Sequence, residues 1–183
     1  MPRYAALLRA INVGGHTVKM DELRAQFEAL RFARVESFIA SGNIMFDTRS
    51  TATASLETRI EKQLLSAFGY PVETFLRTAD ELSAVIAHRP FRADDPVVDG
   101  HTLHVLFLKS SLEPAAEQRL LALSSDYDDF EVVGREVFWR CRGRSSDSKI
   151  TPPMLARAMP APGTARNITT VRKLAARLAI GAG

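Results

Sequence analysis

The order of hydrophobic patterns in the first 78 residues constrains the fold more than any other feature of this sequence. Residues 4–11 are apolar on both alternations, which indicates a strand, and the apolar side chains of 20–30 then recur at the spacing of one helix face. Two β-rich runs follow at 34–40 and 43–47, and the Ser-Gly pair between them suits a hairpin. These patterns predict a strand, a helix and two antiparallel strands, in that order.

The next patterns complete one folding unit. Leu56, Ile60 and Leu64 share a helix face that Gly69 can end in the left-handed conformation, and residues 72–77 indicate another strand. The resulting order, β-α-β-β-α-β, is that of the ferredoxin-like or α-β plait fold. In that fold both helices pack on one face of an antiparallel sheet.

A helix and a loop are predicted to follow. Thr78 and Glu81 have the spacing of a capping box, in which the hydroxyl and the carboxylate each accept a backbone hydrogen bond at the start of a helix. We expect that helix to run through Ile86. Residues 88–100 then contain two prolines and three aspartates, which favours a loop between two halves.

The second half repeats this scheme in part. Gly134 would be first in a two-residue loop, which fits a type II′ hairpin, and Thr151 followed by Pro152 is a good start for a short helix. No fourth strand is predicted here. The predicted elements are a strand at 102–108, a helix at 114–123, strands at 130–133 and 136–140, a short helix from 152, and a last helix along 168–178.

The sequence therefore predicts an α+β protein of two ferredoxin-like halves, each an antiparallel sheet with helices packed on it. Residues 1–78 form the first half, 79–101 a connecting helix and loop, and 102–183 the second half with its basic C-terminal helices. The two halves share an order of elements rather than a recognisable sequence, so an internal duplication is an inference from that order.

Composition narrows the class of protein. No apolar run approaches the roughly 20 residues that a membrane-spanning helix needs, so we expect no membrane partner. Residues 1–8 lack the long apolar core and cleavage site of a signal peptide, which predicts a cytoplasmic protein. The single cysteine, Cys141, has no nearby pattern that would make it a nucleophile, and we interpret it as a structural thiol.

Charge is distributed unevenly along the chain. Between residues 137 and 183 there are nine basic residues against one acid, which is +8, so with +3 for the whole chain the first 136 residues carry −5. Such asymmetry suggests a basic face that attracts a phosphate, a nucleotide or a nucleic acid. The alternative is a solvated helix face, or arginines paired with acids from the first half.

The turn after the first strand is the most site-like segment near the N-terminus. Asn12 tolerates the left-handed conformation, Gly14 and Gly15 expose backbone amides, and Arg9 and Lys19 flank the turn, so an anion can bind there. The segment is neither a P-loop nor a dinucleotide-binding fingerprint, since it lacks their further glycines and the terminal Lys-Ser/Thr. A plain strand-to-helix loop is the alternative.

Other motifs are weaker. Ser146 and Lys149 fit the Ser-x-x-Lys pattern of penicillin-binding acyl enzymes, but the order of the remaining motifs is wrong and Lys-Thr-Gly is absent. His101 and His104, three apart on a strand, would point to opposite faces and could not easily share one metal ion. We expect no metal and no cofactor.

Several segments together resemble a known bacterial family, the domain of unknown function 1697. They are Leu7–Gly15 followed by Lys19-Met20, then Phe38–Asn43, and then Ser148-Lys149 and Thr164–Asn167 with Thr170-Val171. Ala10 stands where the family usually has glycine, and Ile168 where it often has tryptophan. The resemblance covers nearly the whole chain and implies two plait-like halves, but it brings no established activity.

Three hypotheses about function follow. The leading one is a module that binds a phosphorylated or otherwise anionic ligand, such as a nucleotide, a sugar phosphate or a nucleic acid, in a cleft between the two halves. The second is a small hydrolase or transferase using Ser41 or Ser148 with Lys149 in the same cleft. The third is a structural or protein-interaction module without a ligand. The proposed ligand-binding residues are Arg9, Asn12, Gly14, Gly15, Lys19, Ser41, Asn43, Arg144, Ser148, Lys149, Arg166 and Asn167.

Overall fold

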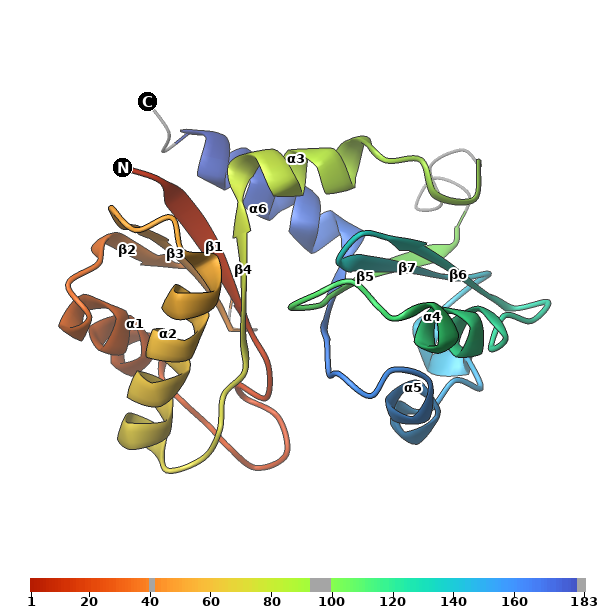
Figure 1. Cartoon of the computed structure of the whole chain (residues 1–183), viewed down its shortest axis with the longest axis horizontal. Coiled ribbons are helices and arrows are strands. Elements are labelled where there is room, and N and C mark those ends of the chain that lie inside the picture. Colours follow the sequence, from red (N-terminus) through yellow and green to blue (C-terminus); the bar gives the residue numbers. More distant parts are fainter. Residues whose placement is uncertain (40–41, 93–99, 181–183) are drawn as a thin grey trace. The chain divides into compact units, whose positions relative to one another are not determined.

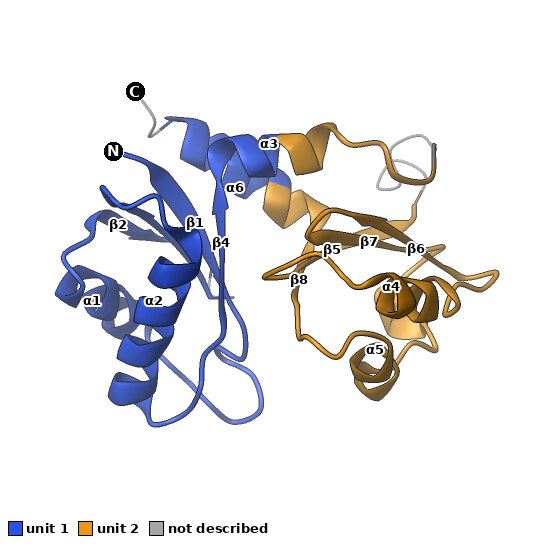
Figure 2. Cartoon of the chain, viewed as in Figure 1, with its two compact units in different colours: residues 1–83, 172–183 blue, residues 84–171 orange. Residues whose placement is uncertain are grey.

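The computed structural model describes residues 1–39, 42–92 and 100–180. The chain divides into two compact units (Figure 2). Unit 1 is Met1–Ser83 together with Arg172–Gly183, and unit 2 is Ala84–Val171. The last twelve residues thus belong to the unit that the first strand begins. The boundaries at 78 and 101 expected from the sequence stay predictions.

The sheet of unit 1 has the ferredoxin-like strand order, as predicted (Figure 1). All neighbouring strands are antiparallel in the order β2-β3-β1-β4. The central strand β1 is buried at every position, which matches its apolar sequence on both alternations. The strands are β1 (Arg3–Leu8), β2 (Ala33–Ser37), β3 (Asn43–Asp47) and β4 (Thr74–Thr78).

Two helices, α1 (Met20–Ala29) and α2 (Thr53–Phe68), cover one face of this sheet (Figure 1). Their apolar stripes meet the sheet in one core that includes Leu23, Phe27 and Ile60, all buried. Gly69 follows α2 with φ 77°, so the predicted left-handed end of that helix is confirmed. The third helix, α3 (Ala79–Ala87), begins at the predicted capping box.

Both hydrogen bonds of that box are formed. The Thr78 N–H donates to Glu81 Oε2 at 2.8 Å, and the Glu81 N–H donates to Thr78 Oγ1 at 3.2 Å. Each bond satisfies an amide at the start of the helix that has no partner within the helix.

The sheet of unit 2 repeats the same order, β6-β7-β5-β8, again with antiparallel neighbours. Its helix-covered face contributes Leu106, Phe130 and Val137 to a core with Leu120 and Met159. The elements are β5 (Thr102–Phe107), α4 (Pro114–Leu121), β6 (Asp128–Val133), β7 (Glu136–Cys141), α5 (Pro152–Ala158), β8 (Thr164–Asn167) and α6 (Ile168–Ile180), with single 3₁₀ turns at Pro90–Arg92 and Ser145–Asp147.

The fourth strand of unit 2 corrects the sequence prediction, which expected none. β8 has only four residues and pairs with β5 from Thr164, opposite Phe107, to Asn167, opposite His104. Its sequence, Thr-Ala-Arg-Asn, contains no apolar β-branched residue, and α6 begins at the next position. The strand therefore forms because it pairs with β5, and its own residues have no preference for extended structure from which it could be predicted.

No helix in the described part of the chain combines the length and the apolar character needed to cross a bilayer.

Candidate functional site

The predicted site residues of unit 1 lie at one end of its sheet, in two loops that touch. The loop 9–19 follows β1, and the turn before β3 lies beside it because the Leu8 N–H donates to the Gly42 carbonyl at 2.8 Å. Gly42 has φ 73°, and a Cβ at that position would lie 3.0 Å from Ile11 Cβ, so a larger residue is disfavoured twice. Two of the family-like segments therefore form one surface.

Asn43 supports this turn from beneath. Its side chain is buried, and Nδ2 donates to the Phe38 carbonyl at 3.1 Å across the turn. Asn43 therefore bonds to the preceding strand side of the hairpin through Phe38 and does not present its amide to solvent. Ser41 lies outside the described residues.

The backbone of the glycine turn has an unusual conformation. The sign of φ alternates along five residues, with positive values of 65° at Ala10, 56° at Asn12 and 63° at Gly14 and negative values between them, and Gly15 follows at 87°. Successive amides in such an alternation point toward one side and form a concavity that suits an anion. Within the described part of the chain, the N–H groups of Val13, Gly14 and Gly15 donate to no acceptor.

The turn is exposed but held in place at both ends. Asn12 Oδ1 accepts a hydrogen bond of 2.7 Å from the Val18 N–H, which closes the loop on itself. The His16 ring stacks on Tyr70 with 4.0 Å between ring centroids. Ile11 and Val18 are buried on either side of the exposed tip. The open amides therefore belong to an anchored loop.

Two cations flank this loop. Arg9 forms an ion pair of 2.7 Å with Glu73, and its side chain is 49% exposed. Lys19, directly before α1, is exposed, and no ion pair to it occurs among the residues that the structure describes. Lys19 is thus the cation of this surface that an anion can approach without displacing a carboxylate.

The predicted residues of unit 2 lie at one end of its own sheet. β5 pairs Thr102 with Cys141 and His104 with Asn167, so the loop that follows β7 and the end of β8 share that edge. Arg144, Ser148 and Lys149 are in this loop.

A buried carboxylate organises the start of that loop. Asp128 Oδ1 accepts hydrogen bonds of 2.8 Å from Trp139 Nε1 and 2.8 Å from Ser148 Oγ, and the Cys141 thiol lies 3.5 Å away. Ser148 Oγ also accepts from the Ile150 N–H at 3.0 Å. The Ser148 hydroxyl is therefore engaged in holding the loop, and Asp128 connects it to two strands.

Cys141 is fully buried beside this carboxylate. Burial, with Asp128 adding to it, raises the pKa of the Cys141 thiol to about 12. The thiol is therefore protonated near neutral pH, which agrees with its interpretation as a structural residue.

The remaining predicted residues of unit 2 divide into exposed and buried groups. Arg144 pairs with Asp147 at 3.3 Å, while Lys149 is exposed and has no ion pair among the described residues. Asn167 Oδ1 accepts from the Thr169 N–H at 2.9 Å, so it caps the start of α6.

Arg166 is only 9% exposed, and Nη1 donates to Thr164 Oγ1 and to the Ala165 carbonyl, both at 2.8 Å. Burial lowers the pKa of Arg166 to about 10, which leaves the guanidinium charged at neutral pH. Arg166 is thus a charged residue whose side chain is buried against its own strand.

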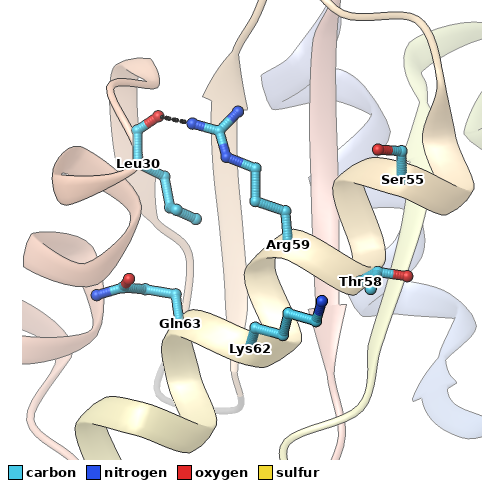
Figure 3. A pocket seen from close by; sticks show the side chains of 6 residues that line it. All are labelled: Leu30, Ser55, Thr58, Arg59, Lys62 and Gln63. Atoms are coloured by element: carbon cyan, nitrogen blue, oxygen red, sulfur yellow. Dashed lines mark hydrogen bonds between the residues drawn. The ribbon is translucent and has the colours of Figure 1, made fainter.

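A pocket on unit 1 was not predicted from the sequence. It has a volume of about 540 Å³ beside α2 and the C-terminal end of α1 (Figure 3). No motif marks its residues, and the available signal was polar side chains recurring at helical spacing along 55–63. The lining residues are Leu30, Ser55, Thr58, Arg59, Lys62 and Gln63.

Comparisons with known proteins place the chain among proteins of open function. The family described as "Protein of unknown function (DUF1697)" matches residues 1–138. The solved structure of a conserved bacterial protein from Streptococcus pneumoniae is similar, with 27% sequence identity and a TM-score of 0.72, over 98% of this chain and 99% of that chain. No curated protein matches the chain.

Proposed function

Because the chain belongs to the DUF1697 family, whose description assigns no activity, we propose a function from the geometry of unit 1: the protein binds a phosphorylated or otherwise anionic ligand at the loop between β1 and α1. The ligand classes are those that carry an accessible phosphate, namely nucleotides, sugar phosphates and nucleic acid ends. The binding residues are Arg9, Asn12, Gly14, Gly15 and Lys19.

One observation carries the proposal. The sign of φ alternates from Ala10 to Gly14. In the same loop, the three consecutive N–H groups of residues 13–15 have no acceptor in the described part of the chain. Left-handed conformations cost a non-glycine residue about 1–2 kcal/mol, yet Ala10 and Asn12 both adopt them. Strained backbone of this kind clusters at ligand-binding loops, and here it directs donors outward.

The side chains suit the same ligand. Lys19 supplies a point charge, and Arg9 can exchange its partly buried partner Glu73 for phosphate oxygens, which its planar guanidinium binds in pairs. Asn12 contributes indirectly, since its Oδ1 fixes the loop through Val18. The loop is anchored before the ligand arrives, so little ordering cost opposes binding.

Amide signals of the loop test the proposal. With ¹⁵N-labelled protein and inorganic pyrophosphate as the probe, we expect saturable shifts of the Val13, Gly14 and Gly15 amides. Lys19→Ala should weaken binding about fivefold, as expected for the loss of one charge-assisted contact. Lys173→Ala, an exposed lysine on α6, is the matched control and should bind like the wild type.

The proposal fails if the amide signals of 13–15 stay unchanged at millimolar pyrophosphate, or if Lys19→Glu binds as tightly as the wild type. Shifts that spread evenly over all exposed amides would also contradict it, because they indicate a general salt effect.

The part that the unit 2 residues take in binding stays a prediction. Arg144, Ser148, Lys149, Arg166 and Asn167 were expected to bind the same ligand as the glycine turn. A double-mutant cycle with Lys19→Ala and Lys149→Ala tests this. A loss of affinity in Lys149→Ala, whether or not it adds to that of Lys19→Ala, indicates one shared ligand, and no effect of Lys149→Ala in either background argues against it.

The enzyme hypothesis receives no specific support from the described residues. A serine nucleophile needs a general base within hydrogen-bond reach. The Ser148 hydroxyl instead donates to Asp128 at 2.8 Å and accepts from the Ile150 amide at 3.0 Å. These bonds give Ser148 a structural role in its loop, so ligand binding is the function that the geometry supports best.

A further inference from the structure

The pocket beside α2 of unit 1 has the chemistry of an anion site, although no motif marks it. Its lining contains two cations, Arg59 and Lys62, two hydroxyls, one amide and a single apolar side chain, Leu30 (Figure 3). No carboxylate is among the lining residues. The volume of about 540 Å³ lies in the range of small-molecule sites.

The acids of α2 are directed elsewhere. Glu57 is buried, and its Oε1 accepts from the Leu76 N–H at 2.9 Å, while Glu61 Oε1 accepts from the Thr74 N–H at 2.9 Å. Both carboxylates therefore bond to the edge strand β4, on the side of the helix away from Arg59 and Lys62. This separation leaves positive charge on the pocket side of α2.

Arg59 is preorganised for a ligand. Its Nη2 donates to the Leu30 carbonyl at 2.6 Å (Figure 3). The guanidinium carbon lies 5.3 Å from the centroid of the Phe32 ring. Stacking and one hydrogen bond fix the plane of the guanidinium while the side chain stays exposed. Its further N–H donors can then bind an oxyanion with less loss of side-chain entropy.

The neutral groups of the pocket suit ligand hydroxyls. Gln63 Nε2 donates to Gln26 Oε1 at 2.8 Å, which directs the Gln63 carbonyl oxygen to accept from a ligand. Ser55 and Thr58 are exposed one helical turn apart, and because Thr58 Oγ1 donates to the Ala54 carbonyl at 3.0 Å, it can accept from a ligand hydroxyl. One leucine offers little surface for a nucleobase, so the lining favours a small hydroxylated ligand.

We propose that this α2 pocket is a second anion site, distinct from the glycine turn, and that it binds a small phosphorylated sugar or polyol. Arg59 and Lys62 bind the phosphate, and Ser55, Thr58 and Gln63 bind hydroxyl groups. The proposal is independent of the loop between β1 and α1, since it shares none of the residues of that loop.

Titration of ¹⁵N-labelled protein with glucose 6-phosphate, inorganic phosphate and glucose tests the proposal. We expect glucose 6-phosphate to shift the amides of 55–63 saturably. Inorganic phosphate should bind the same amides about fivefold more weakly, since it lacks the hydroxyl contacts, and glucose alone should give no shifts at the same concentration.

Variants of exposed residues keep the test free of folding effects. Lys62→Ala should weaken glucose 6-phosphate binding about fivefold, and Lys62→Glu should abolish the shifts at 55–63. Arg49→Ala, an exposed arginine outside the pocket, should bind like the wild type. Arg59→Lys keeps the charge but loses the planar fork, so its binding should fall between wild type and Lys62→Glu.

The α2 proposal is overturned if Lys62→Glu binds glucose 6-phosphate within twofold of the wild type. It is equally overturned if the shifts occur only at 13–15. Shifts only at 13–15 would leave the function proposed for the glycine turn intact. Shifts at 55–63 without shifts at 13–15 would support the α2 pocket and contradict the glycine turn, so the two proposals can fail separately.

Discussion

Ala10 has a φ of 65°, in a region where a side chain with a Cβ is strained and glycine is not. We predict that Ala10→Gly stabilises the protein by about 0.5 kcal/mol, because relief of about 1–2 kcal/mol of strain exceeds the 0.4–1 kcal/mol lost through a more flexible unfolded chain. The midpoint of urea unfolding measures the change.

Ala25→Gly is the matched control for this prediction. Ala25 is exposed within α1, where glycine should cost about 1 kcal/mol, so the same substitution should have the opposite sign there. A lower midpoint for Ala10→Gly would show that strain at this position is not relieved by removing the side chain.

Cys141 should make the free energy of unfolding decrease at alkaline pH. Its folded pKa, about 12, lies above the ordinary value of 9.0, so only the unfolded thiol ionises as pH rises from 9. The contribution of the protonated thiol is therefore complete below pH 9 and is lost as pH rises toward 12. We predict that the unfolding midpoint falls more steeply above pH 9 in the wild type than in Cys141→Ala.

Comparison of the two pH profiles removes the effect of other groups that titrate in the same range, because both proteins share them. Parallel profiles from pH 8 to pH 10.5 would contradict a raised pKa for this thiol. A fast reaction of native Cys141 with a maleimide at pH 8 would contradict it as well.

At the scale of elements, strong periodic patterns were sufficient for most of the fold. The stripe of α2, its end at Gly69 and the capping box of α3 were all predicted, since each depends on residues close together in the sequence. β8 was missed because its four residues have no local preference, and β5 provides the pairing. The same holds for the candidate sites. The glycine turn was predicted from adjacent glycines, whereas the α2 pocket was not, because it also needs Leu30, which is distant in the sequence.

The same elements also reveal repetition that the sequence conceals. In both units a residue at the end of the central strand donates to the turn of the hairpin that pairs with it. Leu8, the last residue of β1, donates to Gly42 at 2.8 Å, and Leu108, the residue after β5, donates to Arg135 at 2.9 Å. On the fourth strands, Arg77 lies opposite Ala5 and Arg166 opposite Val105.

Each of these buried arginines also donates to the carbonyl of the residue before it, at 2.8 Å in both cases, and a residue that caps a helix follows it. Matching hydrogen bonds at matching strand positions support an internal duplication more strongly than the order of elements does.

At the scale of the whole molecule, the two compact units are not consecutive in sequence, because most of the last helix belongs to the unit of the first strand. Residues 172–183 belong to unit 1, and Arg177 pairs there with Glu36 at 3.2 Å. Leu174 and Leu178 of the same helix are buried. This return of the chain to unit 1 could not be predicted from local patterns, since the apolar face of α6 fits any neighbouring apolar surface equally well.

The return of the last helix predicts that damage to it is felt mainly in unit 1. Leu178→Ala removes a fully buried side chain and should cost about 2–5 kcal/mol. Hydrogen exchange should then lose protection in β1, β3 and β4 more than in β5 and β7. Leu120→Ala, equally buried on α4 of unit 2, is the reciprocal control and should lower protection first in β5 and β7. Equal losses in both sheets for both variants would mean that the two units unfold as one, and that the assignment of residues 172–180 to unit 1 has no energetic counterpart.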